Sequence, residues 1–174
     1  MKLVIIAAGR GSRLSSISEG IPKILIEVYN KTLLEHLIHN CVLVGISDIV
    51  IVTGHNSSMI DDYISKKEFR VNIELIYNAD WELPNGVSVL ASKNSIPKDD
   101  DFMISMSDHY YKDDLLLKIK NSELSKTIVN VGSDYKIDMI HDLDDGMKLQ
   151  IDKESNLVNA MSKDLMKYLS LIHI

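Results

Sequence analysis

The chain of 174 residues contains few of the residues that mark specialised classes of protein: it has one cysteine, three prolines, one tryptophan and two phenylalanines. A single cysteine excludes a disulfide framework within one chain. Cys41 lies in an apolar stretch with helical spacing, which predicts a buried small side chain rather than a nucleophile. With so few prolines and no low-complexity tract or repeat, no linker divides the sequence, and we expect a single domain over residues 1–174.

Long hydrophobic runs are also missing. No stretch approaches the roughly 18 apolar residues that a membrane span needs, and no charged segment followed by an apolar one opens the chain as in a signal peptide. The sequence therefore predicts no membrane segment and a cytoplasmic location. With 45% hydrophobic and 25% charged residues, the composition is typical of a globular protein with a sizeable core.

Basic residues are fewer than acidic ones, 19 against 25, so the formal net charge is -6. A nucleic acid needs a basic face on its partner, and this balance argues against nucleic-acid binding. The first 23 residues differ, because they contain Lys2, Arg10, Arg13 and Lys23 but only Glu19 as an acid. Positive charge concentrated in one segment suits a compact anionic ligand.

The same segment reads LVIIAAGRGSRLSSISEGIPK over residues 3–23. A strand-like run ends in small residues and glycines, and a loop then supplies Arg13 and Lys23. Amides of such a loop can approach phosphate oxygens closely, and the two cations neutralise charge that amides cannot. The alternative is a glycine turn with solvated basic residues. A dinucleotide-binding fingerprint does not fit, because Leu14 stands where it needs glycine or alanine, and no Gly-Lys-Ser/Thr of a Walker A loop occurs.

Strand-like and helix-like segments alternate along the chain, which predicts an α/β fold with a doubly wound, mainly parallel, Rossmann-like sheet and helices on both faces. Thr32 and Glu35 form a capping box that fixes one helix start, and Ser58 with Asp61 indicates another. We expect strands over residues 3–6, 24–28, 48–53, 71–77, 102–106 and 127–131, and helices over 32–44, 58–64, 87–93 and 113–120.

The pattern changes towards the C-terminus. Residues 147–151 and 157–159 flank a turn-prone segment and predict a small antiparallel β-hairpin. A short helix over residues 162–169 is expected next. Apolar residues in this last segment would leave exposed surface that favours a homo-oligomer; they are Leu165, Met166, Leu169, Leu171 and Ile172.

Ligands of an open parallel sheet bind beyond the carboxyl ends of its strands. Asp108 follows the predicted strand 102–106 there and is a natural ligand for Mg²⁺, which takes one or two carboxylates plus phosphate oxygens. The alternative role of Asp108 is to cap the next helix. His109 either contacts a substrate phosphate or hydroxyl or satisfies backbone groups.

A second candidate segment is the loop over residues 78–88, which contains the single tryptophan, Trp81. Gly86 and Ser88 at a helix start would offer amides and a hydroxyl to a base or ribose, and the side-chain amide of Asn85 is able to read a pyrimidine edge. The alternative is a turn with Trp81 packed on the surface.

Three sequence blocks occur in a characteristic order: AAGRGSRL with the later PK, then N-x-x-W-E-x-x-N-G-x-S-x-L-x-x-K-N, then a strand ending in M-S-D-H-x-Y. Together they resemble the nucleotidyltransferases that activate sugar phosphates and alcohol phosphates, in particular the inositol-1-phosphate cytidylyltransferases. The resemblance implies that Arg13 holds the triphosphate, Lys23 the phosphates around the reacting centre, Gly86 and its neighbours the base, and Asp108 the metal. It also implies nucleotide contacts from Ala7, Ala8, Gly9, Gly11 and Ser12.

The function expected from these observations is transfer of a cytidylyl group from CTP to an alcohol phosphate, most simply inositol 1-phosphate, with release of pyrophosphate. Arg13, Lys23 and Asp108 would be catalytic, and Mg²⁺ the cofactor. Two alternatives remain open: a sugar-1-phosphate nucleotidyltransferase that uses UTP, dTTP or GTP, and a catalytically impaired nucleotide-binding domain. In each case the partners are small molecules, a nucleoside triphosphate and a phosphorylated alcohol or sugar.

One departure from the family pattern concerns the second metal-binding carboxylate. Members of this type continue past the hairpin to an Asp-Thr-Gly-like segment whose Asp is usually the second ligand, whereas this sequence ends at SLIHI. We therefore expect a nucleotidyltransferase domain that lacks its C-terminal part. The other explanation is that Asp142, Asp144 or Asp145 substitutes for the missing acid.

Overall fold

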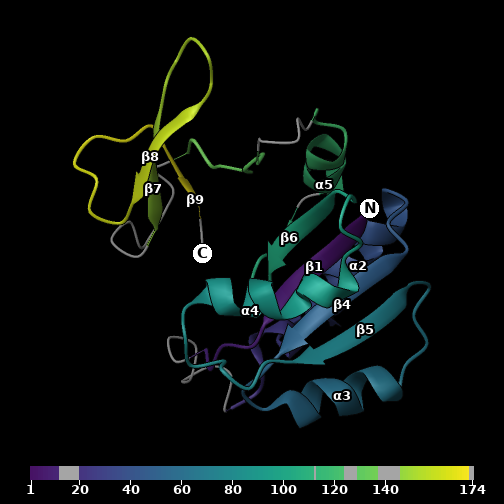
Figure 1. Cartoon of the computed structure of the whole chain (residues 1–174). Coiled ribbons are helices and arrows are strands. Elements are labelled where there is room, and N and C mark those ends of the chain that lie inside the picture. Colours follow the sequence, from purple (N-terminus) through teal and green to yellow (C-terminus); the bar gives the residue numbers. More distant parts are fainter. Residues whose placement is uncertain (12–19, 112, 124–128, 137–145, 173–174) are drawn as a thin grey trace. The chain divides into compact units, whose positions relative to one another are not determined.

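The computed structural model describes residues 1–11, 20–111, 113–123, 129–136 and 146–172 (Figure 1). The chain divides into two compact units, Met1–Lys120 and Asn121–Ile174. The predicted residues Ser12 and Arg13 lie outside the described parts of the chain, as do Asp142, Asp144 and Asp145.

The first unit is built on a four-stranded sheet in the order β5-β4-β1-β6, in which every neighbouring pair is parallel. Its β-branched runs explain why these segments form strands, since such side chains fit a pleated surface covered on both sides. The strands are β1 (Lys2–Ala7), β4 (Asp48–Thr53), β5 (Asn72–Tyr77) and β6 (Phe102–Met106). The register pairs Ala7 with Thr53 and Ile6 with Met106, so the strands end level with one another at one edge.

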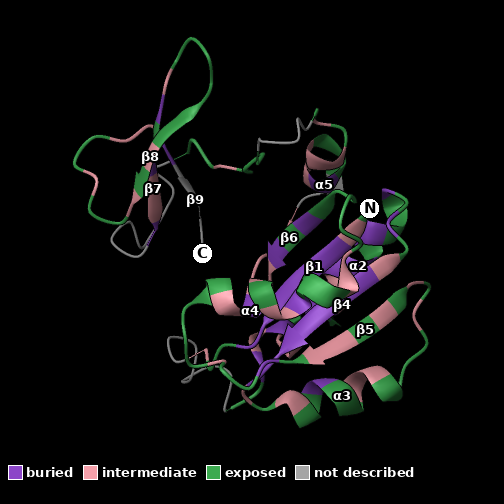
Figure 2. Cartoon of the chain, viewed as in Figure 1, coloured by how far each residue is buried: buried purple, intermediate pink, exposed green. Residues whose placement is uncertain are grey.

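Helices cover both faces of this sheet (Figure 1). On one face, Leu3 and Ile5 of β1 pack with α2 (Leu33–Leu43), α3 (Ser57–Ser65) and α5 (Asp113–Lys120). On the other, Val4 and Ile6 pack with α4 (Asn85–Ala91) and the segment after η3 (Ser92–Ser95). Buried residues fill β1 and β4 at the centre (Figure 2). This arrangement confirms the predicted doubly wound parallel sheet.

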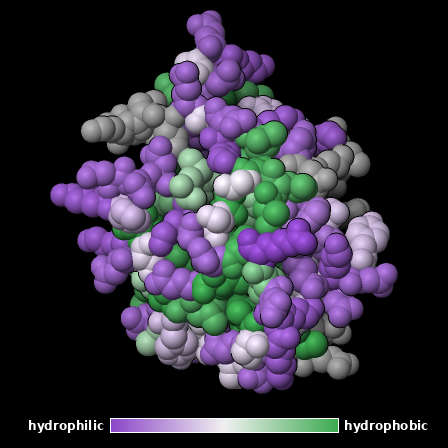
Figure 3. All heavy atoms as spheres, turned by 90° about the vertical axis from the view of Figure 1, so that its right-hand side faces the viewer, coloured by the Kyte–Doolittle hydropathy of each residue, from purple (hydrophilic) through white to green (hydrophobic). Residues whose placement is uncertain are grey.

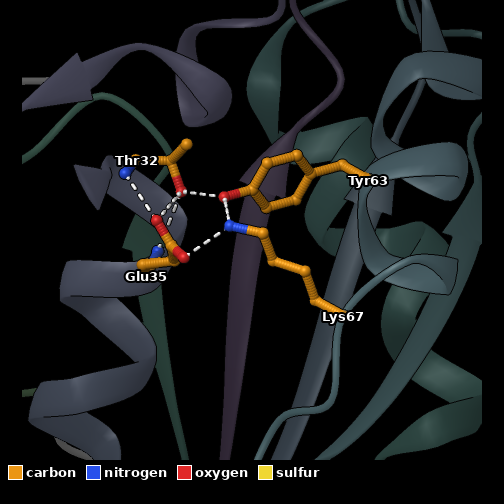
Figure 4. A network of polar contacts seen from close by, with 4 residues as sticks. All are labelled: Thr32, Glu35, Tyr63 and Lys67. Atoms are coloured by element: carbon orange, nitrogen blue, oxygen red, sulfur yellow. Dashed lines mark hydrogen bonds and ion pairs between the residues drawn. The ribbon is translucent and has the colours of Figure 1, made fainter. Parts of the chain in front are cut away.

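The predicted capping box is confirmed and belongs to a larger polar network (Figure 4). The backbone amide of Glu35 donates to the Thr32 hydroxyl at 3.2 Å, and the carboxylate of Glu35 accepts from the Thr32 amide at 2.9 Å. Lys67, beyond the end of α3, donates to Glu35 and to the hydroxyl of Tyr63, both at 2.7 Å. The network therefore joins the start of α2 to the end of α3.

The prediction of one strand over residues 24–28 is wrong. Pro22 starts a 3-10 turn, η2 (Lys23–Leu25), and only β2 (Glu27–Val28) is extended. β2 pairs antiparallel with β3 (Lys31–Thr32) through a two-residue turn. The fixed φ of proline favours the turn, which then takes the residues that an apolar run alone assigns to a strand.

Two helix boundaries also differ from the prediction. α3 begins at Ser57, because Asn56 precedes it in the left-handed conformation at φ 55°, and the side-chain amide of Asn56 donates to the carbonyl of Gly20 instead of capping the helix. α4 starts two residues earlier than expected, at Asn85, directly after Pro84, and ends at Ala91.

The second unit contains a three-stranded antiparallel sheet in the order β8-β7-β9. β7 (Met147–Ile151) and β8 (Val158–Ser162) confirm the predicted hairpin. β9 (Ser170–Ile172) was not predicted, and the helix expected over residues 162–169 does not form. The chain returns there to pair with β7, and the amide of Leu169 donates to the carbonyl of Leu149 at 3.0 Å. Sheet pairing thus outweighs an apolar spacing that fits either structure.

The strand predicted over residues 127–131 lies partly outside the described residues. Its described part, 129–131, is not a strand, and Val129 and Val131 are exposed.

The face turned to the viewer in Figure 3 carries apolar side chains at its centre, surrounded by hydrophilic ones. Within the described segments, no helix has the length and apolar character to cross a membrane.

Candidate active site

Lys23 and Asp108 meet at the carboxyl edge of the sheet, although 85 residues separate them in the sequence. Lys23 begins the turn η2 after the glycine loop, and Asp108 lies two residues beyond the end of β6. The ammonium Nζ of Lys23 lies 2.7 Å from Oδ2 of Asp108. This contact joins two of the sequence blocks that were predicted to share one site.

Gly11 allows Lys23 to take this position. Its backbone is left-handed, with φ 67°, and a Cβ there would lie 3.0 Å from Cγ of Lys23 and 3.1 Å from Cε. The loop backbone therefore rests on the aliphatic stem of the lysine, while the ammonium group extends beyond the stem to Asp108. A side chain at position 11 would push this lysine aside.

His109 completes a chain of contacts around Asp108. Its Nδ1 lies 3.0 Å from Oδ1 of Asp108, and because an ionised carboxylate only accepts, Nδ1 is the donor. The imidazole stacks on the ring of Tyr111, with centroids 5.7 Å apart and planes 18° apart. The hydroxyl of Tyr111 lies 3.2 Å from that of Ser105 in β6. Tyr111, the last residue of the block M-S-D-H-x-Y, and Ser105 thus support the predicted site residue His109, a role that the sequence analysis did not assign to them.

The hydrogen bond from His109 and the contact with Lys23 hold the pKa of Asp108 well below its usual range, against the effect of burial. Asp108 is therefore ionised at any physiological pH. A carboxylate offers about four lone-pair sites, so Asp108 retains acceptor capacity besides these two contacts. Its charge and hard oxygen donors fit Mg²⁺, which keeps waters and takes one or two carboxylates plus phosphates. Among the described residues, no group of three or more acidic, histidine or cysteine residues forms a protein-only metal site.

The described part of the glycine loop has two sections. Ala7 and Ala8 are buried, and the carbonyl of Ala8 accepts a hydrogen bond from the amide of His55 at 3.0 Å. Gly9 is exposed, and a Cβ built on it would meet nothing within 4 Å. The loop is therefore anchored by its alanines and open at Gly9, as an approaching phosphate requires. Contacts of these residues with a nucleotide remain a prediction.

A contact that the sequence analysis missed links this loop to Trp81. A Cβ on Gly54 would lie 2.4 Å from Cβ of Trp81 and 2.7 Å from the carbonyl oxygen of Ala8. The ring of His55 lies against the indole, with centroids 5.0 Å apart. Gly54 follows β4 directly, so the absence of its side chain lets the loop over residues 78–84 approach the glycine loop.

The three residues predicted to bind the base differ in exposure. Asn85 and Gly86 are exposed in the first turn of α4, and nothing lies within 4 Å of a Cβ built on Gly86. Ser88 is buried, and its hydroxyl accepts a hydrogen bond from the side-chain amide of Asn78 at 3.0 Å. Ser88 therefore has a structural role in joining the end of β5 to α4, and nucleotide contacts of all three residues remain a prediction.

A profile of the Nucleotidyl transferase family matches residues 2–138 of this chain. Over 170 residues this chain is 33% identical to "Bifunctional protein GlmU" of Methanococcus maripaludis, and the alignment covers 92% of this chain and 39% of that protein. "Bifunctional IPC transferase and DIPP synthase" of Aquifex aeolicus is 34% identical over 116 residues, covering 66% of this chain and 26% of that protein. The chain thus spans well under half the length of these relatives.

Among solved structures, the inositol-1-phosphate CTP transferase from T. maritima superimposes with a TM-score of 0.84 at 20% sequence identity, covering 99% of this chain and 67% of that one. At this identity the likeness concerns the fold. Because the family profile covers more than half of the sequence, and the sheet has the arrangement of a solved nucleotidyltransferase, the chain belongs to the Nucleotidyl transferase family.

Proposed function

We propose that this chain transfers the cytidylyl group of CTP to an alcohol phosphate, with inositol 1-phosphate as the acceptor, and releases pyrophosphate. The observation that carries the proposal is the contact between Lys23 and Asp108 beside the glycine loop. It brings a cation for phosphate oxygens and a carboxylate for a metal to the edge of the sheet where ligands of this fold class bind. A cytoplasmic location, predicted from the sequence, is consistent with this reaction.

The reaction joins two anions and needs no general base. A phosphate monoester at neutral pH already carries a nucleophilic oxygen, which attacks the α-phosphorus of CTP. One P–O bond forms, the bond to the β,γ-pyrophosphate breaks, and the leaving group departs with its electron pair. The task of the protein is to hold both anions in line and to stabilise the charge that builds up in transit.

Lys23 is the described residue placed for this task. Its ammonium group carries three donors, and only one of them needs to face Asp108. Arg13, which lies outside the described residues, is the second proposed cation. Asp108 would hold Mg²⁺, which when bound supplies charge neutralisation on the phosphates. Gly9 leaves room for the triphosphate, Gly11 leaves room for the stem of Lys23, and His109 is proposed to contact the acceptor.

The choice of CTP and an alcohol phosphate is supported by two observations. The blocks N-G-x-S and S-D-H, which carry Asn85 to Ser88 and Ser107 to His109, resemble those of inositol-1-phosphate cytidylyltransferases. A relative named an IPC transferase is 34% identical over 116 residues. The relatives named GlmU share the fold and the family, so the base and the acceptor need a direct test.

The test is a substrate screen with the 174-residue chain. CTP, UTP, dTTP and GTP are each combined with inositol 1-phosphate, glucose 1-phosphate or phosphocholine, with and without Mg²⁺, and pyrophosphate release is measured. We expect release with CTP and inositol 1-phosphate in the presence of Mg²⁺. Release only with another nucleotide and a sugar phosphate would replace the proposed substrates, and binding of CTP without release in any combination would indicate a binding domain.

A further inference from the structure

Three aromatic rings, one of them two residues after Asp108, form a cluster to which the proposed reaction has so far given no role. Tyr110 packs against His36 with ring centroids 4.9 Å apart and planes at 84°, and Tyr29 lies 6.3 Å from Tyr110 with planes at 60°. The rings come from the turn between β2 and β3, from α2 and from the segment after β6. We call Tyr29, His36 and Tyr110 the aromatic cluster.

Chain connectivity keeps Tyr110 near Asp108, and the ring contacts of Tyr110 bring the other two rings towards the same region. Tyr110 follows Asp108 by two residues, so their Cα atoms are at most about 7 Å apart. Tyr29 lies in the turn that follows Lys23 and η2. The same two segments that supply the cation and the carboxylate therefore also supply the two tyrosines.

The two tyrosines are exposed in spite of their size, 82% for Tyr29 and 52% for Tyr110. His36 is held behind them, because its Nε2 donates to the carbonyl of Val28 at 2.7 Å, which fixes the ring against Tyr110. The cluster thus has one ring that is held by the backbone, His36, and two exposed rings, Tyr29 and Tyr110. Rings packed against each other at the surface contribute little to the core, so their exposed faces are available to a ligand.

The backbone at Tyr29 strengthens this interpretation. Tyr29 and Asn30 have φ values of 51° and 63° in the two-residue turn that pairs Val28 with Lys31. Such a turn favours Asn-Gly, and a bulky side chain with positive φ is a rare and strained choice. Because the ring is exposed, packing within the fold does not offset this strain, which points to a role outside the fold.

We propose that the aromatic cluster is the subsite for the non-phosphate part of the acceptor, and that it selects a ring-shaped polyol phosphate. The inference rests on the proposed function, since it assumes that Lys23 and Asp108 bind the phosphates. A tyrosine face attracts the C–H edges of a polyol ring, and its hydroxyl both donates to and accepts from polyol hydroxyls. A quaternary ammonium group needs several ring faces around it, whereas His36 is tied to Val28 and turned edge-on to Tyr110.

The experiment measures binding as well as turnover. Inositol 1-phosphate, phosphocholine and inorganic phosphate are titrated calorimetrically into the 174-residue chain saturated with an α,β-methylene analogue of CTP and Mg²⁺. We expect Tyr110→Leu to weaken inositol 1-phosphate about 10-fold, the loss of one aromatic contact, and to leave inorganic phosphate within twofold. Tyr110→Phe should bind within about threefold of the parent, because it keeps the ring. In turnover assays the KM for the acceptor should rise while the KM for CTP stays unchanged.

A matched control is Tyr77→Leu, since Tyr77 is 61% exposed and lies on β5, the outermost strand on the side of the sheet away from β6. It should alter none of these affinities. Equal loss of inorganic phosphate and inositol 1-phosphate in Tyr110→Leu would overturn the subsite, and so would stronger, Tyr110-dependent binding of phosphocholine. If no pyrophosphate is released but inositol 1-phosphate binding still depends on Tyr110, the proposed reaction fails and the subsite stands.

Discussion

At the scale of single residues, Lys23 and Asp108 neutralise each other in the described structure. Their charged atoms lie 2.7 Å apart, and both side chains are mostly buried. Removing one partner leaves the other charge in a partly dry site. The two charges of this pair cancel each other, so the pair itself adds no net charge to the candidate site.

Lys23→Ala should lower kcat/KM for pyrophosphate release by about 10²–10³, because a preorganised contact to developing charge is lost from a site that excludes water. The control is Lys67→Ala, which removes an ammonium group also 2.7 Å from a carboxylate, in the network that joins α2 to α3. Near-normal turnover in Lys23→Ala would contradict the role assigned to this lysine.

Gly54→Ala should destabilise the fold by about 1–3 kcal/mol, because its Cβ would lie 2.4 Å from Cβ of Trp81 and cannot be accommodated without backbone movement. Gly86→Ala is the control, since open space surrounds that position and alanine is the better helix former. Urea unfolding of both variants checks this, and equal stabilities would show that the loop around Trp81 adjusts freely.

Sequence patterns located the polar residues of the site but not what holds them. Lys23 and Asp108 were predicted from glycine spacing and from the position after a strand, and the structure brings them together. The closeness of Gly54 to Trp81 and the hydrogen bond from the side-chain amide of Asn40 to the carbonyl of Tyr111 join segments far apart in the sequence, which no local pattern contains. Ser88 was predicted from the motif to contact the nucleotide, and that contact remains a prediction; the hydrogen bond that its hydroxyl accepts from the side chain of Asn78 was not predicted.

At the scale of secondary-structure elements, the network of Figure 4 fixes two helices of one face to each other. Burial alone would raise the pKa of Glu35, but hydrogen bonds from Lys67, Thr32 and Tyr63 lower it to about 2. The folded state therefore prefers the ionised carboxylate. The contribution to stability is present above the unfolded pKa of about 4.3 and is lost as the pH falls from there towards 2.

Glu35→Gln should lower the free energy of unfolding at pH 7 by about 1 kcal/mol, because it removes a partly exposed ion pair with Lys67 and a negative charge at the start of a helix. The difference between the variant and the parent should shrink as the pH falls through 4 towards 2, because the parent carboxylate then becomes neutral as well. Denaturant titrations at several pH values measure this. A difference that does not change with pH would assign the effect to packing.

Elements with a strong pattern were predicted with accurate bounds, as for the strand Phe102–Met106 and the helix Asp113–Lys120. The failures fall on short apolar segments, residues 24–28 and 162–172. There a proline turn and pairing with β7 decided the outcome. Short runs fit helix and strand equally well, so tertiary contacts determine their structure.

At the scale of the whole molecule, the two compact units have separate interiors. Both hydrophobic clusters of the parallel sheet lie within Met1–Lys120, and so do Lys23, Asp108 and the aromatic cluster. The second unit has its own buried residues, Leu149 and Ile151, on the central strand β7 of its sheet.

A chain that ends at Lys120 should therefore still unfold cooperatively, because it keeps the entire core of the parallel sheet. Thermal melts followed by circular dichroism compare it with the 174-residue chain. A broad, uncooperative melt of the shorter chain would show that the second unit is needed to hold the first together.

The left-handed backbone at Tyr29 implies that thermal stability and selectivity for the acceptor place opposite demands on this residue. Replacing residues 29 and 30 by Asn-Gly should stabilise the protein, because both positions have positive φ values and Asn-Gly adopts such a turn without strain. That exchange would also delete an aromatic face from the acceptor subsite. Variants stabilised in this way should therefore discriminate less among phosphorylated alcohols. Selection for discrimination should restore a tyrosine with positive φ at position 29.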